Sequence, residues 1–290
     1  MTPSPLDLAV LSAASALGAR GVPDPDVLLL AGTGLGSLPE RLTFHHSEVA
    51  SVDLTGTPGA PELWTRQPLF HGTLETEHGP ATFWLLEDET LDAPLQPDEA
   101  PWERGFACWL AAHRGATVVL HASAGATLGG ELEPGDLALV SDHLNLTGSS
   151  PLLGLGGSKL GPLFPDVSRL HLDCLRDELQ ALAAGRGLDA RSAVAAATSP
   201  ASLPTPAERE WFRRAGADLW VAGIASPYLA AAHAGLGMAS IVAVTGSEAP
   251  STEVPAILVA SGQAAPALEE LLLEGLVLAA TTARRPDGDG

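Results

Sequence analysis

The chain alternates short apolar runs with amphipathic segments, and this alternation restricts the fold more than any other feature of the sequence. Seven runs have the length and composition of buried strands, at about residues 27–31, 81–86, 117–122, 136–140, 193–198, 217–222 and 240–245. Apolar residues at helical spacing predict helices at about residues 5–18, 103–113, 168–186, 206–215, 227–235 and 266–280. Strands that alternate with helices predict an α/β protein whose largely parallel sheet is covered on both faces.

The length and composition fit one α/β domain. The chain has 290 residues, of which 46% are hydrophobic and 17% charged, so it can build a large core. It shows no internal repeat and no obvious interior linker. We therefore expect a single domain over residues 1–284 and a flexible tail over residues 285–290.

The charge balance restricts the partners. The formal net charge is −20, and Lys159 is the only lysine. Because neutralising nucleic-acid phosphates requires clustered lysine and arginine, we expect no nucleic-acid partner. No apolar run reaches the ~18 residues of a membrane span, and the N-terminus lacks the basic start of a secretion signal. A cytoplasmic protein without a membrane partner is the expectation.

One glycine-rich turn has the chemistry of an anion site. The first predicted strand ends in "AGTGLG", in which Gly32, Thr33 and Gly34 follow the apolar run. Glycines around a hydroxyl residue expose backbone N–H groups that can hold a phosphate. The same pattern also serves a tight strand-to-helix turn without a ligand, and it matches neither a Walker A loop nor the full dinucleotide fingerprint. The residues alone leave both readings open.

Several histidines are candidates for chemistry or for structure. His121 follows "TVVL", where it is either a general base or a polar cap at the end of a strand. His143, next to Asp142 in "SDHLNLTG", is expected to fix a loop. His233 is expected near the end of a helix, whose dipole favours a partly protonated imidazole, and a structural role is the favoured reading. The other histidines considered lack the i, i+4 spacing of a metal-binding helix, so no metal site is predicted.

Five longer stretches carry a resemblance to a known family. They occur in this order: "LLLAGTGLGSLPERL", "TVVLHASAGATLGGELEPGDLALVSDHLNLTGSSPLLG", "LFPDVSRLH", "TPAEREWFRRAGADLW" and "AAAHAGLGMASIVAVTG". Together they resemble successive motifs of the trimeric purine nucleoside phosphorylase family, from about residue 25 to residue 250. The most specific of them is "PGDLALVSDHLNLTG".

The resemblance implies a fold and a reaction. The expected fold is a three-layer αβα domain with a central mixed, partly barrel-like sheet, assembled as a homotrimer. The family reaction is phosphorolysis of a purine ribonucleoside or deoxyribonucleoside to the free base and the sugar 1-phosphate, in purine salvage. Inorganic phosphate is the co-substrate, and no cofactor is implied.

Some family positions are retained. Thr33 stands where the family has a phosphate-binding serine, between Gly32 and Gly34. Ala124 matches an alanine whose backbone amide faces the phosphate. The positions that correspond to the base and ribose pocket are Ala122, Leu203, Ala222, Gly223, Thr245 and Gly246.

Other family positions are replaced. The acidic segment 87–89 stands where the family has a phosphate-binding arginine and histidine, and carboxylates repel a phosphate dianion. Leu203 and Pro204 replace the phenylalanine and the glutamate that recognises the purine. An arginine from segment 102–114, or one from a neighbouring subunit, would restore the phosphate site if it pointed at Thr33.

These replacements leave three functions open. The chain is a phosphorylase with altered or lost activity, a hydrolase-like variant in which water replaces phosphate, or a non-catalytic ligand-binding or scaffold homologue. His121 and Glu208 are the candidate catalytic residues of an altered enzyme.

Overall fold

The structure is a computed structural model that describes residues 3–32, 35, 37–46, 48–88, 96, 98–199, 203–246 and 254–285, with backbone alone at 46 and 254–263. The helices are α1 Pro5–Ala19, α2 Leu38–His46, α3 Glu62–Thr65, η2 Pro101–Gly105, α4 Phe106–His113, α5 Asp173–Gly185, α6 Pro206–Arg214, α7 Ala225–Ala234 and α8 Val254–Arg284. The strands are β1 Val27–Ala31, β2 Ala50–Val52, β3 Leu69–Thr76, β4 Gly79–Glu87, β5 Val118–Thr127, β6 Leu137–Asn145, β7 Ala190–Thr198, β8 Leu219–Ala222 and β9 Gly237–Gly246.

The strands form one mixed sheet, part of which closes into a barrel. Over the described residues the strand order is β2-β3-β4-β1-β5-β8-β7-β6-β9. Because β5 also pairs with β9, the strands β5, β8, β7, β6 and β9 close on themselves. The α/β fold with a mixed, partly barrel-like sheet, predicted from the resemblance, is confirmed.

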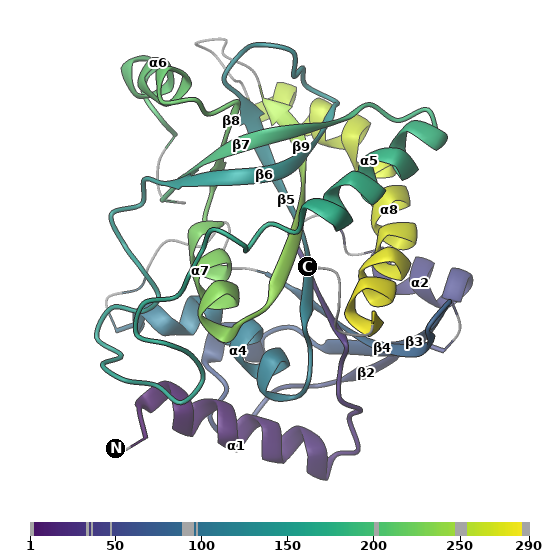
Figure 1. Cartoon of the computed structure of the whole chain (residues 1–290), viewed down its shortest axis with the longest axis vertical. Helices are drawn as coiled ribbons and strands as arrows, with labels where there is room; N and C mark the ends of the chain where they lie inside the picture. The colour runs from purple at the N-terminus through teal and green to yellow at the C-terminus, as the bar shows by residue number, and fades with distance from the viewer. Residues whose placement is uncertain are drawn as a thin grey trace.

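Two large cores lie on opposite faces of the sheet. One contains alternate residues of all five barrel strands, so it fills the barrel, and it continues among α1, α4 and α7. The other packs the outward-facing residues of β5, β6 and β9 against α5 and α8. Figure 1 shows α8 beside α5 on one side of the molecule and α7 beside β9. This layering gives the two faces of β5 different surroundings.

The helices begin where the sequence provides caps. Ser4 and Asp7 form a capping box at the start of α1, with Pro5 in the first turn. Thr205 and Glu208 do the same for α6, where Pro206 follows the cap. These short-range signals explain why the boundaries of both helices agree with the sequence pattern.

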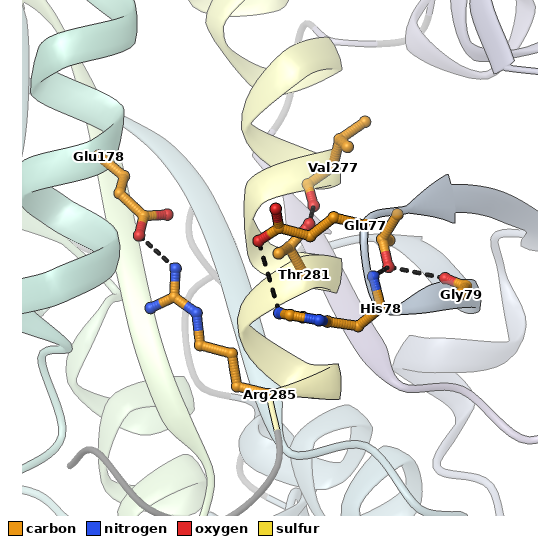
Figure 2. A network of polar contacts seen from close by, with 8 residues as sticks. Glu77, His78, Gly79, Glu178, Val277, Thr281 and Arg285 are labelled. Carbon is orange, nitrogen blue, oxygen red and sulfur yellow. Dashed lines mark hydrogen bonds and ion pairs between the residues drawn. The ribbon is translucent and has the colours of Figure 1, made fainter.

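The C-terminal helix is longer than predicted. It runs from Val254 to Arg284 with Pro266 inside it, although the pattern predicted a start near residue 266. Its last turns are held by polar contacts (Figure 2): Arg285 pairs with Glu178 of α5, and the Thr281 hydroxyl donates to the Val277 carbonyl at 2.8 Å. The Arg285–Glu178 pair fixes the end of α8 against α5, whereas the Thr281 bond lies within α8 itself.

Some elements have no clear signal in the sequence. We predicted no strand at β3 and no helix at α2. β3 carries an uneven burial pattern, because it lies near the edge of the sheet between β2 and β4. The Gly/Pro-rich segment 146–165 contains no helix or strand.

His233 differs from its prediction. It lies in the last turn of α7, but only 4% of its surface is exposed, and burial lowers the pKa of the imidazole. Its Nδ1 accepts a hydrogen bond from Trp109 Nε1 at 2.9 Å, which requires that nitrogen to be unprotonated. The expected partial protonation is therefore wrong, because desolvation outweighs the helix dipole.

The Trp109–His233 hydrogen bond provides a test of this packing. Trp109→Phe leaves the buried His233 Nδ1 without its donor, so we expect the free energy of unfolding to fall by about 1–3 kcal/mol. Denaturant unfolding measures this change. In the matched control Trp211→Phe, where the indole is 55% exposed, we expect a change within about 0.5 kcal/mol. Equal effects in the two variants would contradict the role of the hydrogen bond.

Candidate functional site

The glycine turn follows β1 in the middle of the sheet. Gly32 is buried, and its N–H donates to the Ala122 carbonyl of β5 at 2.8 Å. This bond continues the pairing of β1 with β5, in which Ala31 lies opposite Ala122. Thr33 and Gly34 lie outside the described residues. The turn therefore begins next to the two β5 alanines that the resemblance assigns to the site.

Ala124 marks an opening beside the sheet. It lies on β5, which pairs with β8 and β9. Residues of such an interior strand are normally buried by neighbouring elements, but Ala124 is exposed. It is in register with Ala243 of β9, and the Thr245 hydroxyl donates to the Gly125 carbonyl at 3.2 Å. The predicted positions on β5 and β9 thus come together at one place.

The predicted positions on β8 lie next to the end of β7. Ala222 is in register with Thr198, and the N–H of Gly223 donates to the Thr198 carbonyl at 3.0 Å. Thr198 in turn lines a cavity of about 450 Å³, within the usual volume range of small-ligand sites. Its other lining residues are Leu146, Ser199, Pro204, Glu208, Trp211 and Phe212.

Glu208 lines this cavity, and Leu203 is adjacent in the sequence to a residue that lines it. Leu203 is 60% exposed and directly precedes Pro204, which lines it. Glu208 accepts a hydrogen bond from the backbone N–H of Thr205 at 2.6 Å as part of the helix cap, and this contact lowers the pKa of the carboxyl. The ionised Glu208 carboxylate therefore has a structural role as part of the helix cap. The same exposed side chain also lines the cavity.

A second, smaller cavity of about 240 Å³ adjoins the glycine turn. Gly32 and Glu87 both line it, and Glu87 is in register with Ala31 at the end of β4. The next residue, Asp88, is fully buried, and its N–H donates to the Ala31 carbonyl at 2.8 Å. Glu87 and Asp88 of the acidic segment therefore lie near Gly32, where the glycine turn begins.

The two arginines of segment 102–114 are engaged elsewhere. Arg104 is buried in an ion pair with Glu99, at 2.8 Å between Nε and Oε1. Arg114 pairs with Asp24 and donates to the Val22 carbonyl, near the amino end of β1 and so away from Gly32. Among the described residues that line the two cavities, none is a lysine or an arginine.

His121 points away from these cavities. Side chains alternate along β5, so His121 lies on the barrel side of the strand while Ala122 and Ala124 lie on the other side. The imidazole is fully buried, which lowers its pKa to about 3 and keeps it neutral. Neither ring nitrogen has a hydrogen-bond partner in the structure.

Two further histidines join His121 around one tyrosine, and the sequence analysis missed this cluster. Tyr228 of α7 contacts all three rings edge to face, with centroids 5.5 Å from His121, 5.1 Å from His143 and 5.2 Å from His171. His143 Nδ1 lies 3.1 Å from His171 Nε2. Burial lowers the pKa of His143, and it lowers that of His171 to about 4, so both rings are neutral at pH 7. His171 was overlooked because it lies 28 residues from His143, at the start of a segment predicted as the helix 168–186, whereas α5 begins only at Asp173.

The fold defines a class: α/β proteins with a mixed sheet, part of which closes into a five-stranded barrel. The family model of the phosphorylase superfamily matches residues 106–276, more than half of the chain. The chain therefore belongs to the phosphorylase superfamily.

Known purine nucleoside phosphorylases resemble the chain, some over most of its length and one over about half. Purine nucleoside phosphorylase 1 of Geobacillus stearothermophilus is 26% identical over 251 residues, which are 85% of this chain and 87% of the relative. Purine nucleoside phosphorylase 1 of Bacillus subtilis is 28% identical over 140 residues, 48% of this chain and 51% of the relative. The crystal structure of isoform 2 of purine nucleoside phosphorylase from Schistosoma mansoni, with cytosine and ribose-1-phosphate, has a TM-score of 0.80 at 18% identity. That alignment covers 93% of this chain and 95% of the other.

A search for membrane spans gave a negative result: within the described residues, every helix is too short or too polar to cross a bilayer.

Proposed function

We propose that the chain binds a purine nucleoside, or a close chemical relative, in the cleft beside β5, β7, β8 and β9, and that its phosphate-dependent cleavage is weak or lost. The observation that carries this proposal is that Ala222 lies in register with Thr198, which lines a cavity of about 450 Å³. Ala124 and Thr245 lie close together on the neighbouring strands β5 and β9. The similarity to purine nucleoside phosphorylases supports a nucleoside as the ligand class.

The acidic surroundings of the glycine turn support the second part. A phosphate beside Gly32 would lie near Glu87, and like charges repel by about 1 kcal/mol at 4 Å in water and more in a partly buried site. Segment 81–101 contains no arginine, and Arg104 and Arg114 have other partners. A homotrimer, a cytoplasmic location and inorganic phosphate as the co-substrate of any residual activity belong to the same proposal.

Binding and cleavage are tested separately. Calorimetric titration with inosine and guanosine measures binding, and release of free base is followed with and without phosphate. We expect binding of at least one nucleoside and little release under either condition. Release that requires phosphate at ordinary enzymatic rates would contradict lost phosphorolysis. Release without phosphate would instead establish the hydrolase-like alternative, and the absence of binding would refute the nucleoside site.

A substitution at the cleft tests its location. Ala124→Phe introduces a ring where Ala124 is exposed, so we expect nucleoside affinity to fall at least about tenfold, a change of about 1.4 kcal/mol. Ser192→Phe is the matched control, because Ser192 is also exposed on a strand but lies near the amino end of β7. Equal loss in both variants, or none in either, would place the ligand elsewhere.

A further inference from the structure

Asp142, His143 and His171 bring three potential metal ligands together from two distant segments. One ligand atom from each lies within 4.8 Å of the others. Asp142 and His143 are on β6, whereas His171 follows the long segment 146–170 and forms a bridge with Met238 of β9. We propose that these three residues bind one divalent transition-metal ion of the zinc type.

The distance between the two imidazoles fits a shared ion. Histidine nitrogens bind zinc at about 2.0–2.1 Å, so two of them on one tetrahedral ion lie roughly 3.3 Å apart. His143 Nδ1 and His171 Nε2 are 3.1 Å apart. Two imidazoles and a carboxylate are a usual protein donor set for zinc and for its first-row neighbours, and they leave at least one coordination position open. Asp142 is exposed, so the ion can enter from solvent.

The surroundings provide an independent reason to expect a bound group. His121 is fully buried on the same side of the barrel, and neither of its nitrogens has a partner; His171 Nδ1 is also buried without one. Buried polar atoms without a partner usually cost about 1–3 kcal/mol each, and they often occur where an ion or a water is bound. Tyr228 packs against all three rings and restricts their orientation.

The position of the site assigns the ion a structural role. His121 and the cluster lie on the barrel side of β5, opposite Ala122 and Ala124, so the ion would not lie in the nucleoside cleft. It would join β6 to the C-terminal end of segment 146–170, which contains no helix or strand over residues 146–165. Metal binding should therefore raise the melting temperature and protect this segment from proteolysis.

Metal titration of the purified full chain tests the proposal. After treatment with a chelator and its removal, the protein is titrated with Zn²⁺ by calorimetry, and with Co²⁺ by visible absorption. We expect one equivalent of either ion to bind, with d–d bands typical of nitrogen and oxygen ligands for Co²⁺. In Asp142→Asn and His171→Gln we expect affinity to fall at least about 100-fold, since each variant removes a proposed ligand. Asp142→Asn keeps the shape of an exposed side chain and should fold normally.

An exposed pair provides the matched control. His78 Nε2 lies 3.4 Å from Glu77 Oε1 at the β3–β4 turn (Figure 2), a histidine–carboxylate contact outside the cluster. His78→Gln should leave the affinity unchanged. The proposal is overturned if no stoichiometric binding occurs. The 3.1 Å distance between His143 Nδ1 and His171 Nε2 would then be that of a hydrogen bond between the two imidazoles. It is also overturned if binding survives in both Asp142→Asn and His171→Gln.

Discussion

Acid is expected to destabilise the protein between pH 6.5 and about pH 4 through His121. The imidazole has a pKa of about 3 in the folded chain, because burial disfavours its charged form, against about 6.5 when unfolded. Below pH 6.5 the unfolded chain therefore binds the proton more tightly than the folded one. The contribution of the neutral His121 to the free energy of unfolding is therefore fully present above pH 6.5. It falls as the pH drops towards the folded pKa, by up to about 1.4 kcal/mol per pH unit.

His121→Leu isolates this contribution. The variant replaces a buried ring without hydrogen bonds by an apolar side chain of similar size, so we expect unchanged or higher stability at pH 7. Relative to the wild type it should gain about 2–3 kcal/mol between pH 6.5 and pH 4.5. Urea unfolding across this range, with a chelator present, measures the difference. His113→Leu, at an exposed histidine, should keep the wild-type pH profile. A wild-type profile in His121→Leu would show that His121 does not carry the effect.

Arg104→Met is expected to lower the free energy of unfolding by about 3–5 kcal/mol. The Arg104 and Glu99 side chains are only 6% and 8% exposed, and they form a two-point contact: Nε lies 2.8 Å from Oε1, and Nη2 donates to Oε2 at 3.1 Å. Removing the cation leaves the Glu99 carboxylate buried without its main counter-charge, and such a loss is among the largest effects of a single substitution.

Two comparisons separate this effect from a general loss of packing. The double variant Arg104→Met, Glu99→Leu removes both charges and should recover most of the lost stability. Arg66→Met breaks the exposed Arg66–Glu62 pair, and we expect a change of less than about 1 kcal/mol. Thermal and denaturant unfolding provide the measurements. A double variant no more stable than Arg104→Met would show that methionine packing, and not the unpaired carboxylate, causes the loss.

Much of the fold was predictable because its signals are local. Each of the seven predicted strands overlaps an observed one, since runs such as 27–31 and 240–245 are buried on both faces and need no knowledge of their neighbours. The caps of α1 and α6 are likewise short-range patterns. The prediction failed at β3, whose mixed burial follows from its place near the sheet edge, and at the start of α8, where Pro266 was read as a boundary.

The candidate nucleoside site was predictable for a different reason. The motifs of a known family identified its positions along the chain, but the physical pattern of the residues alone left the glycine turn open between an anion site and a plain turn. That these positions lie together depends on strand register, as in the pairing of Thr198 with Ala222 and of Ala124 with Ala243. The single-domain boundary at residue 284 stays a prediction.

By itself, the sequence determined most of the strands, most of the helices and the family, because these depend on residues close together in the chain or on extended motifs. Only the tertiary structure decided which side chains face one another. It decided that His121 lies on the barrel side of β5 and Ala122 on the other side, whereas strand alternation alone requires only that the two lie on opposite faces. It also brought His171 to within 3.1 Å of His143 across 28 residues, where the sequence had indicated only a loop contact. The physical reason is that side-chain proximity is set by sheet register, barrel closure and helix packing, which involve residues distant in the chain.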